Sequence, residues 1–117
     1  MPGVETSLPL MLTAMQEGKC DLAQIQKWMC SGPAALYGIP NKGVIREGFD
    51  ADLTLVNLDV SKVVSDEEVF SKVKWSPFSG RALTGWPIYT IVGGNIVFDN
   101  GIVRDNVYGK ALTYASQ

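Results

Sequence analysis

Two acidic residues, Asp50 and Asp52, come closer to a catalytic pair than any other side chains in this sequence. They flank one small residue in a glycine-framed stretch, residues 43–56, which leads into the β-prone segment Leu53–Val56. A carboxylate pair can carry out general acid and base catalysis. Short carboxylates ahead of a strand also accept hydrogen bonds from nearby backbone N–H groups and fix a turn. We favour the turn role, and the sequence assigns no catalytic residue here.

The absence of histidine limits function more than any other feature of the composition. Histidine is the commonest metal ligand and the readiest general base near neutral pH. A hydrolytic zinc site usually combines two or three imidazoles with a carboxylate, and a Ser-His-Asp or Cys-His arrangement is excluded. Cys20 and Cys30 lie ten residues apart, which is not the spacing of a metal knuckle, so we interpret them as reduced thiols. The sequence predicts no metal ligand in this chain.

Composition describes a globular chain with the length of one domain. Hydrophobic residues make up 46% of the 117 residues and charged residues 19%, with a net charge of −2. This balance leaves no basic surface for nucleic acid or an acidic membrane. No apolar run approaches the roughly 20 residues of a membrane span, and no leader pattern is present. We therefore expect a cytoplasmic protein with neither nucleic acid nor membrane as partner.

The first part of the chain predicts three short helices. The first begins at Ser7 as N-cap, carries a stripe of Leu and Met residues, and ends at Gly18. The second begins at Asp21, with Gln24 completing a capping box. Ser31-Gly32-Pro33 is expected to break it and to start the third helix, residues 33–37, ending at Gly38.

The later part of the chain predicts strands and tight turns. Residues 88–92 and 96–98 form a hairpin through Gly93-Gly94-Asn95, and Asn100-Gly101 forms a second turn into residues 102–103. We expect this sheet to be covered on both faces because its strands are apolar on both. Ser65 is expected to start one helical turn, and the aromatic residues of the 75–81 loop are expected to plug a core.

Five motifs, taken in order, resemble the end of a cyclic amidohydrolase, and most closely a dihydroorotase, with allantoinase next. The likeness extends from Pro2 to about Val103. The motifs are Pro2-Gly3-Val4-Glu5-Thr6-Ser7-Leu8-Pro9-Leu10-Met11-Leu12, Ser31-Gly32-Pro33-Ala34-Ala35-Leu36-Tyr37-Gly38, residues 43–56, Ser76-Pro77-Phe78-Ser79-Gly80, and Gly85-Trp86-Pro87-Ile88-Tyr89-Thr90-Ile91-Val92-Gly93-Gly94.

The resemblance implies an α+β chain: short N-terminal helices at the end of a (β/α)8 barrel, residues 1–42, then antiparallel hairpins of an incomplete small β-sandwich domain, residues 43–105, and a tail, residues 106–117. It implies a zinc enzyme of pyrimidine biosynthesis that interconverts dihydroorotate and carbamoyl-aspartate. The family's metal ligands and catalytic aspartate all lie upstream of the matched part, so the segment alone is expected to be inactive and without cofactor.

One functional element carries over by resemblance, the Pro-Gly loop that lies over the active site. Its main chain would bind the substrate ring through the Gly3 N–H and the carbonyls of Pro2 and Gly3, since proline has no N–H to donate. Glycine suits this role because it lets the backbone approach a ligand closely. Glu5, nearby, is interpreted as an acid that stabilises the N-terminus of the first helix.

The resemblance also indicates partners and leaves alternatives open. The remainder of the barrel is the first expected partner. In the family the sheet of the small domain also takes strands from upstream residues, so without them one apolar face of the hairpins would be uncovered and the isolated chain is expected to self-associate. A non-catalytic dihydroorotase-like module that holds aspartate transcarbamoylase is one alternative, a segment of an allantoinase is a second, and an autonomous small binding domain is a third.

Overall fold

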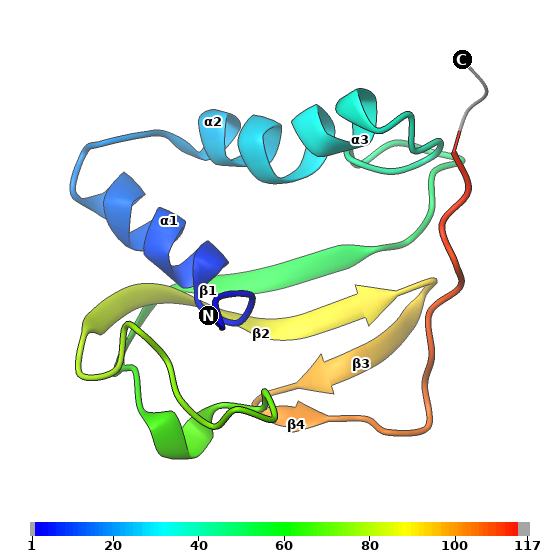
Figure 1. Ribbon diagram of the computed structural model, residues 1–117. Coiled ribbons are helices and arrows are strands. Elements are labelled where there is room, and N and C mark those ends of the chain that lie inside the picture. Colours follow the sequence, from blue (N-terminus) through cyan, green and yellow to red (C-terminus); the bar gives the residue numbers. More distant parts are fainter. Residues whose placement is uncertain (1, 115–117) are drawn as a thin grey trace. The chain divides into compact units, whose positions relative to one another are not determined.

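The computed structural model describes residues 2–114, and Figure 1 shows helices in the first part of the chain and strands in the second. This arrangement confirms the predicted α+β class. The helical elements are α1 (Ser7–Gln16), α2 (Leu22–Gln26), the π-helical segment η1 (Lys27–Ser31), α3 (Gly32–Leu36) and the 3-10 turn η2 (Asp66–Glu68). The strands are β1 (Leu53–Val63), β2 (Ala82–Val92), β3 (Asn95–Asp99) and β4 (Ile102–Val103).

The four strands form one sheet in the order β1-β2-β3-β4. Strands β2 and β3 are antiparallel, as are β3 and β4, and the register shifts between Thr90 and Ile91. The turn residues Gly93 and Gly94 both have positive φ (56° and 82°), as do Asn100 (46°) and Gly101 (90°). Both predicted hairpin turns are confirmed, because two consecutive positive φ values are what the tightest hairpin turns require.

Two helix ends follow the predicted local signals. The Asp21 side chain accepts from the Gln24 N–H and the Gln24 side chain accepts from the Asp21 N–H, so the capping box is present. Helix α1 is followed by Gly18 (φ 79°), whose N–H bonds to the Met15 carbonyl. The N-cap of α1 is Thr6 rather than the predicted Ser7, and its side chain makes no capping bond.

The predicted helix break at Ser31-Gly32-Pro33 is wrong, because α2, η1 and α3 follow one another without interruption. Pro33 has no N–H to offer, and the helix widens just before it. The Gly32 N–H bonds to the Lys27 carbonyl, five residues back. A Cβ on Gly32 would lie 2.4 Å from that carbonyl oxygen, so glycine makes the π-helical turn possible.

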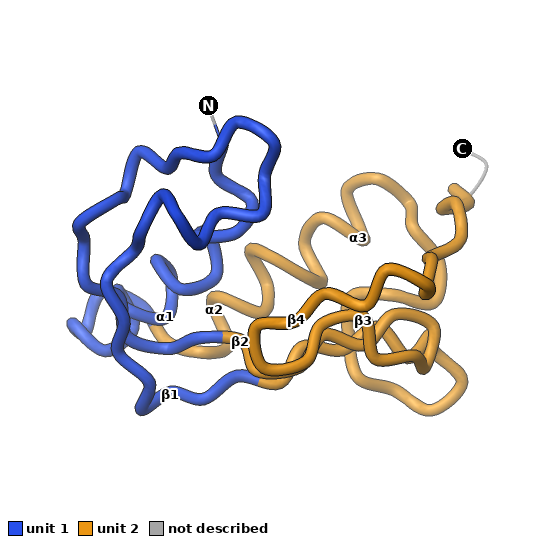
Figure 2. Tube along the Cα trace, turned by 90° about the horizontal axis from the view of Figure 1, so that it is seen from below, with its two compact units in different colours: residues 1–20, 56–86 blue, residues 21–55, 87–117 orange. Residues whose placement is uncertain are grey.

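The chain forms two compact units that interleave along the sequence, shown in different colours in Figure 2. Unit 1 combines the chain up to Cys20 with Val56–Trp86, and unit 2 combines Asp21–Leu55 with the chain from Pro87 onward. The division at residues 42 and 105, which rests on family architecture, stays a prediction. The apolar core residues are Leu12, Val64, Val69 and Leu83 in unit 1, and Ile25 and Ala34 in unit 2.

One prediction of burial is not met. Trp75 is 43% exposed, so it does not plug a core. Residues 88–92 and 96–98, whose apolar pattern predicted cover on both faces, are half-buried throughout, whereas the outermost strand, β4, leaves Ile102 69% and Val103 45% exposed. Within residues 2–114, no helix has the length and apolar character needed to cross a membrane.

Candidate functional site

The Pro2-Gly3 segment forms the start of a turn that leads into α1. The Gly3 carbonyl accepts from both the N–H and the hydroxyl of Thr6, each at 3.4 Å, and Thr6 is only 6% exposed. The Gly3 carbonyl already accepts two hydrogen bonds from Thr6. Two groups therefore stay available for the predicted contact with substrate: the Gly3 N–H and the Pro2 carbonyl. The assignment of Pro2 and Gly3 to substrate binding stays a prediction.

Glu5 does not stabilise the N-terminus of α1, so that prediction is wrong. The first turn of α1 contains no acidic residue, and the Glu5 side chain reaches another segment of unit 1. Its Oε1 accepts from the Phe70 N–H at 2.9 Å and its Oε2 from the Ser71 N–H at 3.1 Å. The carboxylate therefore joins two segments that are far apart in sequence.

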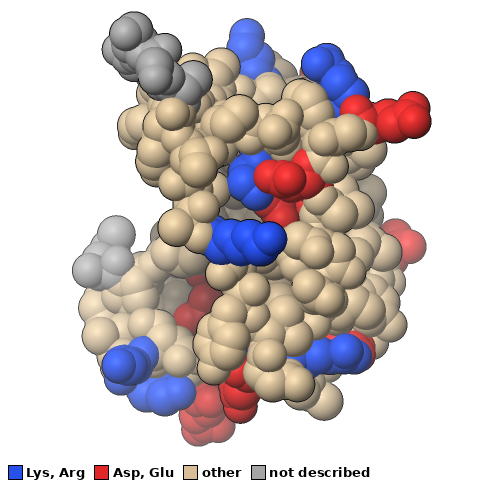
Figure 3. Space-filling view, turned by 90° about the vertical axis from the view of Figure 1, so that its right-hand side faces the viewer, with Lys and Arg blue, Asp and Glu red and all other residues tan. Residues whose placement is uncertain are grey.

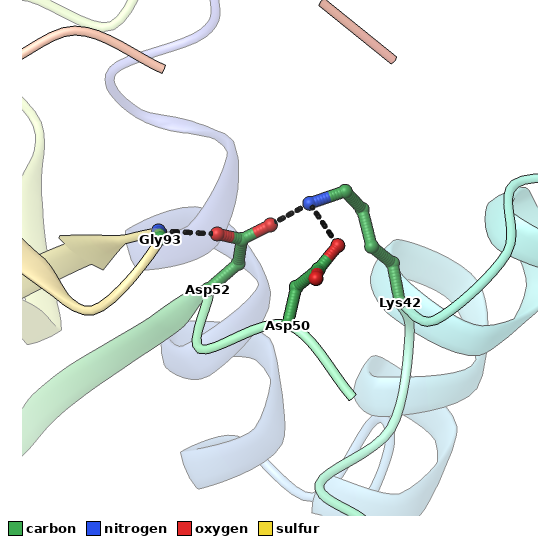
Figure 4. A network of polar contacts seen from close by, with 4 residues as sticks. All are labelled: Lys42, Asp50, Asp52 and Gly93. Atoms are coloured by element: carbon green, nitrogen blue, oxygen red, sulfur yellow. Dashed lines mark hydrogen bonds and ion pairs between the residues drawn. The ribbon is translucent and has the colours of Figure 1, made fainter. Parts of the chain in front are cut away.

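A second polar cluster, in unit 2, brings together Lys42, Asp50, Asp52 and Gly93 (Figure 4). The Lys42 ammonium pairs with the Asp50 carboxylate at 3.1 Å and with Asp52 Oδ2. Asp52 Oδ1 accepts from the Gly93 N–H at 2.8 Å. Asp52 therefore lies between the lysine and the hairpin turn, which ties the start of β1 to the end of β2.

The turn interpretation is wrong for the Asp50 side chain and is met only in part by Asp52, because neither carboxylate accepts from a neighbouring backbone N–H. Asp52 accepts a backbone N–H, as expected, although the donor is on a hairpin distant in sequence. The Asp50 side chain bonds to Lys42 instead, and the Asp50 main chain fixes the turn: its N–H donates to the Asn41 carbonyl and its carbonyl accepts from the Asp52 N–H, both at 2.9 Å. Sequence reasoning missed Lys42, which has no local pattern that sets it apart.

The polar cluster borders a groove of about 640 Å³ in unit 2. Residues 108–113 of the tail line one wall of it, although Tyr108 is 83% exposed and Leu112 is 44% exposed. Its walls include Ile39, Lys42, Phe49, Asp50, Asp52, Val92, Tyr108, Lys110 and Leu112. Figure 3 shows basic and acidic side chains side by side near the middle of one face.

Hydrogen bonding and charge shift two pKa values in the cluster. The Lys42 ammonium and the Gly93 N–H hold the pKa of Asp52 below its ordinary value, and burial opposes them. The Asp52 carboxylate raises the pKa of Lys42 above its ordinary value, and Asp50 adds to the effect. A lowered acid pKa stabilises the fold above the unfolded pKa and loses its effect as pH falls through the folded pKa. A raised lysine pKa stabilises the fold at pH values below the pKa of the unfolded state. This stabilisation is lost as the pH rises through the pKa of the folded state.

We expect Asp52→Ala to lower the free energy of unfolding by about 1–2 kcal/mol at pH 7, because it removes a charge-assisted hydrogen bond and a partly exposed ion pair. Asp52→Asn keeps an acceptor for the Gly93 N–H and loses only the charge, so its deficit should be smaller. That deficit should shrink as the pH falls through the lowered pKa of Asp52, because the wild-type carboxylate then also becomes protonated. Urea unfolding at several pH values measures both effects.

Asp50→Ala is the matched control, since Asp50 shares Lys42 but its side chain is 50% exposed. Its cost should stay below about 1 kcal/mol, the scale of an exposed ion pair. Equal losses for Asp50→Ala and Asp52→Ala would contradict the role of the Gly93 bond.

The donor set does not fit the zinc of a hydrolytic site. The sequence has no histidine, and within residues 2–114 no group of three or more Cys, Asp and Glu side chains is placed to hold a metal ion. Cys20 is half-buried and Cys30 is exposed, and both are free thiols. No step of a reaction is assigned to a metal held by these residues.

Comparison with known proteins gives the class to which this α+β segment belongs. The Amidohydrolase family model matches residues 3–97, so the chain belongs to the amidohydrolase family. This match confirms the resemblance drawn from the five motifs.

Relatives within this class include dihydroorotases and an L-hydantoinase. The chain is 39% identical to a dihydroorotase from Methanosphaera stadtmanae over 89% of its length and 24% of that protein's. It is 40% identical to an L-hydantoinase from Paenarthrobacter aurescens over 95% of its length and 25% of that protein's. The solved structure of L-hydantoinase from Arthrobacter aurescens matches with a TM-score of 0.89 over 95% of this chain and 25% of that one, at 40% identity. The chain therefore spans about a quarter of the length of the curated relatives it matches.

Proposed function

We propose that this chain is the C-terminal segment of a cytoplasmic cyclic amidohydrolase that opens the ring of dihydroorotate to give carbamoyl-aspartate. The observation that supports the substrate is the 39% identity to a dihydroorotase across 89% of this chain. The reaction hydrolyses a ring amide, and in its biosynthetic direction the same bond closes with loss of water.

In this proposal the chain supplies substrate contacts and no metal ligand. Zinc, where a protein of this class holds it, polarises the amide carbonyl and activates water, and its ligands would come from the remainder of the barrel. The Gly3 N–H would donate to a ring carbonyl, and the Pro2 carbonyl would accept a ring N–H. Backbone groups suit a cyclic amide because its ring carries alternating donors and acceptors.

L-Hydantoinase supports a second candidate, hydrolysis of a five-membered hydantoin ring. The identity of 40% over 95% of this chain is as high as that to the dihydroorotase. Dihydroorotate and hydantoins share the cyclic amide and differ in ring size and in the ring carboxylate. A segment that contacts the ring only through its backbone could bind either substrate, so the rest of the protein would determine which substrate is preferred.

The assembly alternative, a module that holds aspartate transcarbamoylase, also remains a proposal. The solved structure of an inactive dihydroorotase-like domain from the Chaetomium thermophilum CAD-like multifunctional protein matches with a TM-score of 0.67 and 21% identity. At that identity the likeness supports the fold alone. The allantoinase alternative stays open beside it.

The deciding experiment compares the whole protein that contains this segment with the isolated chain. We expect the whole protein, loaded with zinc, to hydrolyse dihydroorotate with a kcat/KM at least about tenfold above those for 5-substituted hydantoins and allantoin. A hydantoin or allantoin preference would overturn the proposed substrate, and turnover of none of the three would support the assembly module.

The isolated chain is expected to bind no stoichiometric zinc and to turn over none of these substrates, because it has no imidazole ligand. It is also expected to self-associate in sedimentation velocity, since β4 exposes apolar residues at the edge of the sheet. Stoichiometric zinc with turnover would contradict the first expectation, and a monomer at all concentrations the second.

A further inference from the structure

We propose that Glu5 is a positioning residue that holds the Phe70–Ser71 segment against the Pro2-Gly3 turn and thereby orders the backbone that contacts the substrate ring. This inference rests on the proposed function, because it takes substrate contact by Pro2 and Gly3 as its starting point. The proposal gives Glu5 a role that requires contact with neither a metal nor a reacting atom, because its partners are backbone N–H groups.

The contact is a two-pronged clamp. Glu5 Oε1 and Oε2 accept from two consecutive backbone N–H groups, Phe70 at 2.9 Å and Ser71 at 3.1 Å. The donors lie 65 and 66 residues along the chain, within the same compact unit. Two charge-assisted hydrogen bonds from one carboxylate to consecutive N–H groups fix orientation as well as distance, so the carboxylate restrains how the turn can rotate against the Phe70–Ser71 segment.

The turn needs such a restraint at its tip. Its C-terminal end is anchored by the buried Thr6, which donates twice to the Gly3 carbonyl. Val4 is 92% exposed, so packing contributes little between Gly3 and Glu5. The Glu5 carboxylate therefore provides the long-range anchor for the residues next to Gly3.

The segment that receives Glu5 is itself ordered. The Lys74 N–H donates to the Ser71 carbonyl at 3.1 Å, and the Lys74 ammonium donates to the Val69 carbonyl at 3.0 Å. Val69 is 8% exposed and belongs to the core of unit 1. The clamp thus connects the Pro2-Gly3 turn to a loop that the core holds in place.

The expected consequence concerns substrate binding more than the chemical step. A binding backbone that is already ordered loses less conformational entropy when the substrate arrives. The turn holds no metal ligand and no proton shuttle, so disorder in it weakens binding in the ground and transition states alike. Such a change raises KM and leaves kcat nearly constant.

The first arm of the test measures backbone amide exchange in the 117-residue chain by NMR. We expect Glu5→Ala to speed exchange of the Phe70 and Ser71 amides about tenfold or more, and Glu5→Gln, which keeps a single acceptor oxygen, to have an intermediate effect. The Thr84 amide, bonded to Thr13 Oγ1 in the same unit, should keep its rate. Glu17→Gln is the matched control, because Glu17 pairs with Lys19 at the surface.

The second arm measures kinetics of the whole zinc-loaded protein with dihydroorotate and a hydantoin. Glu5→Ala should raise KM about fivefold to tenfold with kcat changed less than about twofold, and Glu5→Gln should recover part of the loss. Glu17→Gln should leave both constants unchanged.

The two arms separate the possible failures. Unchanged exchange at Phe70 and Ser71 in Glu5→Ala would overturn the clamp. Faster exchange of the Phe70 and Ser71 amides in Glu5→Ala with an unchanged KM would show that Glu5 only stabilises the fold, and it would overturn the positioning role. A wild-type protein that turns over neither substrate would refute the proposed function, and the positioning role with it, while the exchange arm would still report whether the clamp exists.

Discussion

Replacing Leu12 with alanine should lower the free energy of unfolding by about 3 kcal/mol, within the usual range for a buried leucine. Leu12 is 1% exposed and lies on α1 in the core of unit 1. A Cβ added to Gly85 would lie 2.7 Å from the Leu12 Cβ, so strand β2 passes unusually close to this side chain. The tight fit leaves little freedom for neighbours to fill the space that alanine would create.

Leu22→Ala is the matched control for this prediction. Leu22 is also a helical leucine, and it is 57% exposed. Its truncation should cost less than about 0.5 kcal/mol, the usual scale of a surface substitution. Urea denaturation of both variants gives the comparison. Similar losses for the two would show that α1 does not pack as described.

Gly43→Ala should lower the free energy of unfolding by about 3 kcal/mol, from strained backbone and steric overlap together. Gly43 has φ 99°, and its added Cβ would lie 2.8 Å from the Ala34 Cβ and 3.1 Å from the Cys30 carbonyl oxygen. Both neighbours belong to the helical segment of unit 2 and cannot move without distorting it. The loop at the start of the 43–56 stretch therefore packs directly on the helix.

Gly48→Ala separates the two causes. Gly48 has φ 86° in the same stretch, but an added Cβ would meet nothing within 4 Å. Its cost should be about 1–2 kcal/mol, the backbone strain alone. Thermal and urea unfolding of the two variants should give a clear difference, and equal losses would contradict the close approach of Gly43 to the helix.

The amino-acid sequence by itself determined the structures that a few neighbouring residues control. The capping box at Asp21, the end of α1 at Gly18 and the two glycine-containing hairpin turns all formed as predicted. Each depends on bonds within a turn or on a φ value that glycine or asparagine tolerates. The order of five motifs also indicated the amidohydrolase family, which the match over residues 3–97 established.

Two errors came from reading a local signal without its surroundings. Gly32 and Pro33 normally mark a helix break, but the Lys27 carbonyl bonds to the Gly32 N–H across a π-helical turn and the helix continues. Strand β1 extends to Val63, well beyond the predicted Val56, because pairing with a neighbouring strand supports residues whose own pattern is weak.

Only the tertiary structure decided where the acidic side chains act. Glu5 bonds to backbone 65 and 66 residues away, and Asp52 bonds to Gly93, 41 residues away. Nothing in the residues next to a carboxylate specifies a donor at that distance, since long-range partners follow from how the strands and loops are brought together. The sequence thus determined the family and the turns. Tertiary packing determined the partners of three acidic side chains: Asp50 pairs with Lys42, Asp52 bonds to the Gly93 hairpin turn, and Glu5 bonds to the Phe70–Ser71 segment.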